Sequence, residues 1–227
     1  MKAPIAVALD APDLLTLKTW SLAVAQSVDT LKVGLEVYLR DGAAAIDVIK
    51  QTDCRLFLDL KLHDIPNTVA GAARSIARFE PDFLTVHASG GAAMIEAAAK
   101  ALPQTRVTAV TILTSLSEQD LEAIGYQGSA LESVTRLAKL AVEAGARAIV
   151  CSAHEVAAVR SVVPANITLI TPGVRPEGGD LGDQVRVATP QQAIADGADL
   201  VVIGRPITGA VDISGAASHI AQSLLTA

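Results

Sequence analysis

The sequence has few cysteines, few aromatic residues and no surplus of basic charge, and each shortage narrows what the chain can do. Its two cysteines, Cys54 and Cys151, lie in or beside apolar runs, which favours buried thiols over a disulfide and predicts a cytoplasmic protein. Aromatic residues make up 3% of the chain, and the formal net charge is -6. That charge argues against nucleic acid as a partner, because such a surface needs a basic stripe.

Long apolar runs and linkers are also missing. No stretch reaches the roughly 18 apolar residues of a transmembrane helix, and the opening run Met1–Asp10 is too short and too soon charged for a signal peptide. No Pro/Gly/Ser-rich linker, charge block or low-complexity tract divides the 227 residues. The length fits one large domain, so we expect a single domain over residues 1–227 and no membrane partner.

What is present is an alternation of short β-rich apolar runs with longer Ala/Leu-rich segments of helical period. Strands are predicted near Ile5–Leu9, Thr30–Val33, Leu56–Leu60, Phe83–His87, Val107–Leu113, Ala148–Cys151, Thr168–Thr171 and Leu200–Gly204. Helices are predicted near Leu14–Ser27, Leu35–Gln51, Thr68–Phe79, Ala92–Ala101, Ala130–Ala144, Glu155–Val163, Pro190–Asp196 and Ile213–Leu225. Repeated βα units of this kind indicate a parallel sheet covered by helices.

Eight such units in a chain of this length predict an α/β fold of the (β/α)8 TIM-barrel type. The alternative is an open, doubly wound sheet, but no G-x-G-x-x-G follows the first strand. A barrel should gather its catalytic groups at the carboxyl ends of the strands. The polar residues at predicted strand ends are Asp10, Lys32, Asp59, Lys61, His87, Thr111, Thr114, Ser115, Thr171, Arg175 and Arg205.

The most informative stretch is Phe57–Thr68, which begins as a buried strand and ends in a helix start. It carries Asp59, Lys61 and Asp64, and charges are rarely buried unless paired. Residues i and i+2 of a strand point to the same face, about 6.6 Å apart along it, so Asp59 and Lys61 project together. Solvation of the barrel rim is the alternative reading of these charges.

Such a network, with Lys32 added, favours the charged form of every member. Protonated lysines are unsuited to Schiff-base chemistry, which needs a neutral amine, but one can stabilise a carbanion and then protonate it. A neighbouring carboxylate disfavours a substrate carboxylate and promotes loss of CO2. Asp59, His63 and Asp64 are conceivable metal ligands, but Lys61 lies between them and would repel a cation. We therefore expect no metal.

The end of the chain predicts a phosphate site. Gly204 and Arg205 directly follow the last predicted strand, where barrels of this type often bind phosphate. Glycine allows close backbone approach, and arginine binds phosphate through two nitrogens. A simple turn with a solvated arginine is the alternative. The polar, glycine-rich stretch 175–184 is expected to be a lid over the ligand or else a plain surface loop.

Taken together, the motifs resemble those of orotidine 5′-phosphate decarboxylase in its short bacterial form. The motifs that carry the resemblance are Val7–Asp10, Lys32–Gly34, Leu58–Thr68, Leu113–Ser115, Thr171–Arg175 and Ile203–Ile207. The third is highly specific, and the match runs nearly from end to end. The resemblance implies a TIM barrel that forms UMP in de novo pyrimidine biosynthesis without a cofactor or a metal.

The resemblance also implies roles for the charged residues. Asp10 and Lys32 would hold the ribose hydroxyls, with Lys32 also part of the charge network. Asp59 would face the substrate carboxylate, and Lys61 would protonate C6 after CO2 leaves. In this family the catalytic charges act without help from a prosthetic group.

Other positions match the family's substrate contacts. Asp64 resembles a residue donated across a homodimer interface together with Ile65 and Thr68, so that each site needs two subunits. Thr114 resembles a pyrimidine contact. The lid and phosphate contacts implied by the resemblance are Arg175, Gln184, Gly204 and Arg205.

Two other functions remain open. The pattern Asp59-x-Lys61-x-x-Asp64 also fits the magnesium-dependent 3-keto-gulonate-6-phosphate decarboxylases and hexulose-6-phosphate synthases, although Ile65–Thr68 and Pro172–Arg175 favour the orotidylate family. The second alternative is a non-catalytic barrel that binds a nucleotide. Such a barrel would tolerate loss of Lys61, whereas this chain keeps the whole charge array.

Overall fold

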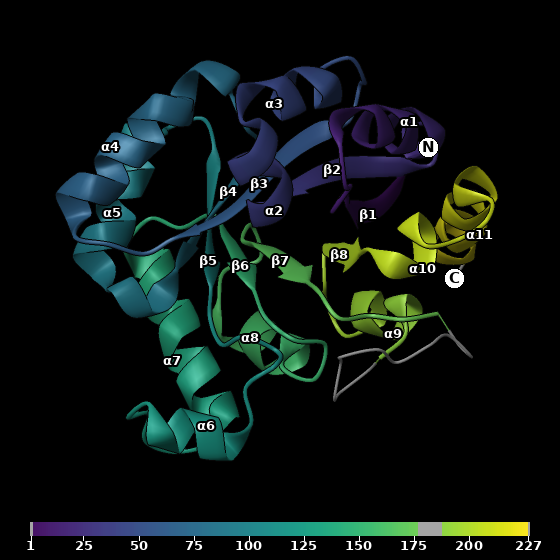
Figure 1. Ribbon diagram of the computed structural model, residues 1–227. Coiled ribbons are helices and arrows are strands. Elements are labelled where there is room, and N and C mark those ends of the chain that lie inside the picture. The colour runs from purple at the N-terminus through teal and green to yellow at the C-terminus, as the bar shows by residue number, and fades with distance from the viewer. Residues whose placement is uncertain (1, 177–187, 227) are drawn as a thin grey trace.

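The computed structural model describes residues 2–176 and 188–226. Its eight strands are parallel and pair in chain order, and β8 pairs with β1, so the sheet closes into a barrel surrounded by helices (Figure 1). This confirms the predicted (β/α)8 fold, and the open doubly wound sheet is wrong. Among the helices of these residues, none has the length and apolar character that a membrane crossing requires.

The strands lie close to their predicted positions. They are β1 (Ala3–Ala8), β2 (Val28–Gly34), β3 (Arg55–Leu62), β4 (Phe83–His87), β5 (Arg106–Val110), β6 (Ala148–Val150), β7 (Thr168–Thr171) and β8 (Leu200–Ile203). The largest difference is at β5, which was expected to reach Leu113. There the chain leaves the sheet after Val110, and the Thr111 hydroxyl donates a hydrogen bond to the carbonyl of Val150 on β6.

The helices include two that the sequence pattern did not predict, α6 and α10. The longer helices are α1 (Leu14–Val24), α4 (Pro66–Ile76), α5 (Ala92–Ala101), α7 (Ala130–Glu143) and α11 (Ile213–Leu225). The shorter helices are α2 (Leu35–Asp41), α3 (Ala43–Ile49), α6 (Glu118–Ala123), α8 (Val156–Val162), α9 (Pro190–Ala195) and α10 (Arg205–Thr208). Short 3-10 turns, η1 (Ala77–Phe79) and η2 (Ala88–Gly90), follow α4 and β4.

The predicted helix Leu35–Gln51 is wrong as one element, because the chain forms α2 and α3 instead. The break is at Gly42, whose φ of 54° lies in the left-handed region. Glycine adopts that conformation without the steric cost that a Cβ brings. The Gly42 N–H donates to the carbonyl of Tyr38, which closes α2. Helical periodicity continued across the glycine, so the pattern alone did not reveal the break.

The interior of the barrel holds a small apolar core below the site. Its buried members are Ala6, Phe57, Phe83, Ala148, Ile170 and Leu200. The rings of Phe57 on β3 and Phe83 on β4 lie 5.5 Å apart. Alternate residues of a strand share a face, so the next inward positions toward the carboxyl ends are Asp59 and Thr85. The apolar floor therefore gives way to polar groups within one step along two adjacent strands.

Candidate active site

A pocket of about 190 Å3 lies inside the carboxyl ends of the strands. Phe57 forms part of its apolar wall, and Lys32, Asp59, Lys61 and Thr114 contribute polar groups. This is the end of the barrel where the architecture places catalytic groups. Few polar groups converging in a mostly apolar hollow are typical of a small-molecule site.

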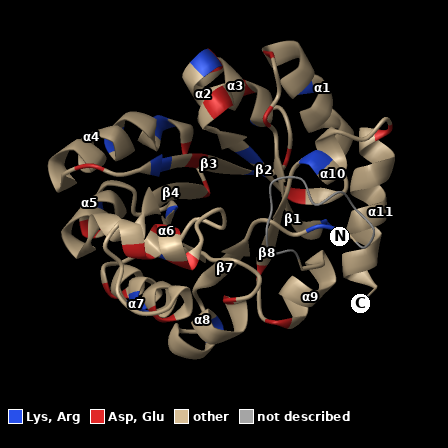
Figure 2. Ribbon diagram, turned by 60° about the horizontal axis from the view of Figure 1, so that its bottom comes forward, with Lys and Arg blue, Asp and Glu red and all other residues tan. Residues whose placement is uncertain are grey.

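Asp59 is the centre of a charge network at this pocket. The Lys61 ammonium donates to Oδ1 of Asp59 at 2.8 Å, and the Lys32 ammonium lies 3.1 Å from Oδ2. Lys32 also lies 3.9 Å from Asp10 at the outer edge. Figure 2 shows the charged segments of β2 and β3 beside one another among mostly uncharged barrel strands. The network therefore alternates negative and positive side chains, in the order Asp10, Lys32, Asp59 and Lys61.

The side chains of the network differ in how far they are exposed, and this decides which of them a ligand can contact. The Asp59 side chain is 13% exposed, Lys32 is 10% exposed and Asp10 is 54% exposed. The Lys61 side chain is 30% exposed, so it meets both the buried carboxylate and the open pocket. A ligand in the pocket can therefore contact Lys61 without displacing it from Asp59.

Lys61 is held by an irregular end of β3 rather than by regular strand geometry. Leu58 pairs with Leu84 and Leu62 pairs with Val86, so β3 contains two more residues than β4 over this span. Lys61 itself has a φ of 47°, an unusual backbone conformation for a residue with a side chain. Extra residues of this kind re-aim side chains beside active sites. The predicted same-face pairing of Asp59 and Lys61 therefore depends on a bulge.

The charges around Asp59 keep its carboxyl group ionised. Burial alone would raise its pKa, but the positive charges of Lys32 and Lys61, and the hydrogen bonds they donate, hold the pKa below its ordinary 3.8. The pKa of His87 on β4 is also lowered, and for a base a lower pKa favours the neutral form. Burial first, and then the charges of His63 and Lys61, lower the pKa of His87 below 6.5, so it is neutral beside the network at pH 7.

The lowered pKa of Asp59 predicts a pH-dependent part of the stability. A folded-state pKa below the unfolded value stabilises the fold above the unfolded pKa, and this contribution is lost as pH falls through the folded pKa. Asp59→Asn leaves Lys32 and Lys61 without their shared counter-charge, and we expect it to cost about 1–3 kcal/mol at pH 7. Urea unfolding at pH 7, 4 and 3 should show this difference shrinking as the solution becomes acidic.

The control for this measurement is Glu143→Gln on α7. Glu143 is exposed and has no ion pair among the described residues, so its substitution should change stability little at any of these pH values. A stability difference for Asp59→Asn that stays constant from pH 7 to pH 3 would contradict an ionised, ion-paired Asp59.

Gly34 is a site residue that the sequence motifs contained but that spacing gave no reason to single out. It ends β2, and a Cβ built on it would lie 3.0 Å from both the Lys32 ammonium nitrogen and Oδ1 of Asp10. Any larger residue would press on these two groups. Glycine at this position thus leaves the space in which the Asp10–Lys32 pair sits.

Asp64 lies outside the charge network of its own chain. Residues 63–68 are all exposed, Ile65 at 66%, and no lysine or arginine of the described residues forms an ion pair with Asp64. Its Oδ1 instead accepts the backbone N–H of Ile65 at 2.6 Å. The charge network within one chain therefore does not include Asp64, because the chain turns outward after β3. Donation of Asp64 across a dimer interface stays a prediction.

The predicted phosphate and lid residues differ in exposure, and one of them lies outside the described residues. Gly204 follows β8, and Arg205 begins α10 with an exposed side chain. Arg175 is 8% exposed, and its backbone N–H donates to the carbonyl of Ala188 at 3.0 Å. That bond joins the two flanks of the segment 177–187. Gln184 lies outside the described residues, as does most of the predicted lid.

Thr85 is the residue that sequence reasoning missed most clearly. Its hydroxyl donates to Oδ1 of Asp59 at 3.0 Å and accepts the backbone N–H of Lys61 at 2.8 Å. The signal was its place two residues after Phe83 in a predicted strand, which puts it on the inward face. Threonine is common in strands, so composition gave no reason to single it out.

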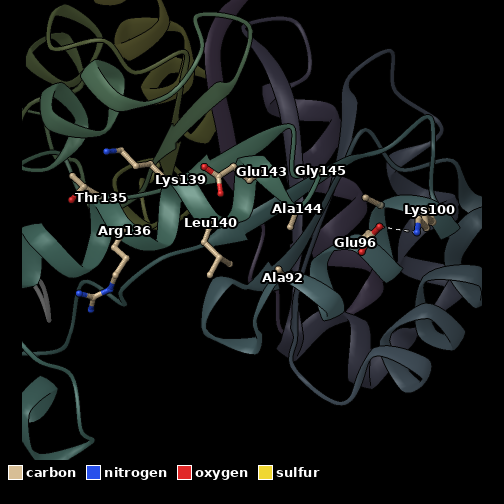
Figure 3. A pocket seen from close by; sticks show the side chains of 11 residues that line it. Ala92, Glu96, Lys100, Thr135, Arg136, Lys139, Leu140, Glu143, Ala144 and Gly145 are labelled. Carbon is tan, nitrogen blue, oxygen red and sulfur yellow. Dashed lines mark ion pairs between the residues drawn. The ribbon is translucent and has the colours of Figure 1, made fainter.

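A larger hollow, of about 1040 Å3, lies elsewhere, between α5 and α7. Figure 3 shows its charged groups spread along the two helices rather than converging, with one ion pair between Lys100 and Glu96 at 2.7 Å. It is a shallow surface groove that lies away from the carboxyl ends of the strands. The smaller pocket at the strand ends, with its buried charge network, is therefore the candidate active site.

Comparison with known proteins identifies the family of this chain. Residues 3–220 match the model of the orotidine 5′-phosphate decarboxylase / HUMPS family. The chain belongs to this family. An orotidine 5′-phosphate decarboxylase of Thermobifida fusca is 61% identical over 99% of this chain and 97% of the relative. One of Frankia casuarinae is 52% identical over 100% of this chain and 89% of the relative.

Solved structures of the family have the same fold. The crystal structure of orotidine 5′-phosphate decarboxylase from Lactobacillus acidophilus superposes with a TM-score of 0.86, at 34% identity, over 98% of this chain and 99% of that one. The Pyrococcus horikoshii enzyme superposes with a TM-score of 0.82 at 24% identity, over 97% and 99% of the two chains, and shows the fold alone. This chain therefore shares its barrel with both of these structures.

The charge network does not fit a magnesium ion, which the sugar-phosphate relatives require. Oδ1 of Asp59 accepts from both Lys61 and Thr85, and Oδ2 pairs with Lys32. A cation at Asp59 would have to displace two ammonium groups that already neutralise the carboxylate. Among residues 2–176 and 188–226, no three His, Cys, Asp or Glu side chains are grouped so that they could hold a metal ion.

Proposed function

We propose that this chain decarboxylates orotidine 5′-phosphate to UMP in de novo pyrimidine biosynthesis. The observation that carries the proposal is an ionised Asp59 carboxylate held between Lys32 and Lys61 at the wall of the pocket. Family membership over nearly the whole chain supports it, as do the names of relatives at 61% and 52% identity. A magnesium-dependent sugar-phosphate reaction is disfavoured by the occupied oxygens of Asp59.

The chemistry follows from the charges. Loss of CO2 from C6 of the pyrimidine leaves a carbanion that no adjacent group delocalises well, so the barrier is large. Preorganised charges that stabilise the transition state are usually the largest catalytic contribution, and enzymes lower barriers by about 8–23 kcal/mol. Asp59 would repel the substrate carboxylate, and this repulsion is relieved as CO2 departs. The Lys61 ammonium would stabilise the carbanion and then transfer a proton to C6.

Other residues would hold the nucleotide. We assign the ribose hydroxyls to Lys32, which lines the pocket, and to Asp10, which lies 3.9 Å from the Lys32 ammonium. Thr114 lines the same pocket and would contact the pyrimidine. The phosphate and lid contacts in this proposal are Arg175, Gln184, Gly204 and Arg205. Phosphate binding remote from C6 supplies energy that places the substrate carboxylate beside Asp59.

The active form in this proposal is a homodimer in which Asp64 completes the site of the partner subunit. The exposed run 63–68, with Ile65 at 66% exposure, supports an interface at the start of α4. Ile65 and Thr68 would enter the partner's site with Asp64, so each site would contain residues of both subunits.

Free thiols at Cys54 and Cys151 support a cytoplasmic location of the protein in this proposal.

The direct test is loss of the orotidine 5′-phosphate ultraviolet band when purified protein is added with excess EDTA. We expect the band to disappear and UMP to form in equal amount, because no step needs a metal ion. Unchanged absorbance would contradict the proposal. The same protein with Mg2+ restored would then be assayed for decarboxylation of 3-keto-gulonate 6-phosphate and for formation of hexulose 6-phosphate, the reactions of the alternative function.

A further inference from the structure

We propose that Thr85 is a positioning residue, whose single hydroxyl sets the relative placement of Asp59 and Lys61. The inference rests on the proposed function and deepens it. Thr85 is on β4, is 1% exposed and faces the barrel interior. It acts through two neighbours and does not touch the ligand space itself.

The hydroxyl of Thr85 is a hydrogen-bond donor and a hydrogen-bond acceptor at the same time. It donates to Oδ1 of Asp59 at 3.0 Å and accepts the backbone N–H of Lys61 at 2.8 Å. A threonine hydroxyl has one donor and two acceptor lone pairs, so its one hydrogen is committed to the carboxylate. The Asp59 carboxylate and the Lys61 backbone are thereby joined through one oxygen atom.

The bulge explains why this link is needed. Between the pairs Leu58–Leu84 and Leu62–Val86, regular pairing of β3 with β4 is interrupted. A backbone N–H buried in such a gap needs a partner, and the Thr85 hydroxyl provides one for Lys61. Lys61 has a φ of 47°, and a strained conformation of this kind persists only where its surroundings impose it.

Lys61 is therefore held at both ends. Its ammonium donates to Oδ1 of Asp59 at 2.8 Å, the same oxygen that accepts from Thr85. Its main-chain nitrogen is bonded to the Thr85 hydroxyl. Loss of the hydroxyl frees the backbone of the bulge and removes one of the three donors on the Asp59 carboxylate. The proton donor and the anion would then shift relative to a bound substrate, although the pocket lining stays complete.

The experiment compares Thr85→Val with Thr85→Ser. Valine keeps the shape of threonine and removes the hydroxyl, while serine keeps the hydroxyl. We expect Thr85→Val to lower kcat for orotidine 5′-phosphate about 10- to 100-fold, since small misplacements of reacting groups have effects of that size. KM should change less than about threefold, because the lining is unchanged, and Thr85→Ser should retain kcat within about threefold of wild type.

A second readout follows the charge rather than the rate. Hydrogen bonds to a carboxylate favour its ionised form, so Thr85→Val should raise the pKa of Asp59, measured by carbon NMR of the labelled carboxyl. The titratable groups around Asp59 are Lys32 from β2, Lys61 from β3 and His87 from β4, and Thr85→Val substitutes none of them. The difference in pKa between the two proteins therefore reports the lost hydroxyl together with any shift of Lys61 that its loss causes.

Thr108→Val on β5 is the matched control. Thr108 is fully buried, and its hydroxyl donates to the carbonyl of Arg106 at 2.9 Å. Within the described residues it forms no hydrogen bond with Asp59 or Lys61. It tests whether loss of any buried threonine hydroxyl from the barrel has the same effect, and we expect wild-type kcat. Should Thr85→Val fail to fold, Thr85→Ala makes the same comparison with Thr85→Ser.

Two results would overturn the inference. One is a folded Thr85→Val protein with wild-type kcat and an unchanged Asp59 pKa. The other is Thr85→Ser with as large a loss as Thr85→Val, which would assign the effect to packing of the methyl group. Inactive wild-type protein would contradict the proposed function instead, and the NMR comparison would still test the hydrogen bond.

Discussion

Replacing Lys61 with alanine should abolish decarboxylation while the protein still binds UMP. The ammonium of Lys61 pairs with Asp59, and Lys61 lines the pocket with a side chain that is 30% exposed. The proposed reaction uses this ammonium twice, to stabilise the carbanion and to protonate it. General acid catalysis alone contributes about 100- to 10,000-fold. With the electrostatic contribution added, we expect a loss of kcat of at least about 10,000-fold.

Binding and folding provide the controls for this variant. UMP affinity, measured by calorimetry, should fall little, because the proposed phosphate and ribose contacts do not include Lys61. Lys100→Ala removes a lysine from an exposed ion pair on α5 and should leave kcat at the wild-type value. A Lys61→Ala protein that still turns over the substrate would show that the proton comes from another group. It would also indicate that the charge network contributes to binding of the nucleotide and not to the reaction.

Mixing two inactive variants should restore activity if the site is shared between subunits. Asp64→Ala alone should lower kcat at least about 100-fold, as expected for loss of a preorganised charge. In a hybrid dimer with Lys61→Ala, one site combines the intact Lys61 of one chain with the intact Asp64 of the other. Random exchange makes half of the dimers hybrids with one good site each, so about a quarter of the wild-type activity should return.

The hybrid experiment depends on demonstrated subunit exchange. Native mass spectrometry of chains carrying different affinity tags would establish the fraction of hybrid dimers. Activity that rises in proportion to that fraction supports an Asp64 donated across the interface. Hybrids that form but remain inactive would contradict a shared site. Mixing Lys61→Ala with Asp59→Ala serves as the control. Lys61 and Asp59 pair within one chain, so each chain of the hybrid lacks one residue of its own network and no intact site can form.

Much of the fold, and the end of the barrel at which the candidate site lies, could be predicted from the sequence, because both depend on local patterns. Short apolar strands alternate with helical segments, and parallel βα units of that number close into a barrel. Polar residues at strand ends then meet at one rim for topological reasons. The strand period predicted that Asp59 and Lys61 lie together, and they do, although the structure reaches this pairing through a bulge in β3 and not through regular alternation.

Other features depend on contacts between distant segments, and the sequence alone did not determine them. The Thr85 hydroxyl reaches Asp59 and Lys61 only because β4 packs beside an irregular end of β3. Gly34 matters because the ends of two side chains meet beside it. The tertiary structure also turns Asp64 outward, away from the network that its spacing suggested.

The sequence by itself determined which residues carry charge, in which order, and at which ends of which strands. Only the tertiary structure decided how those charges pair, because pairing depends on strand register, on a bulge at β3 and on hydroxyl groups supplied by a neighbouring strand. Burial then decided their chemistry. Asp59 stays ionised because two ammonium groups outweigh the cost of removing it from water, and those groups are brought together by the closed barrel.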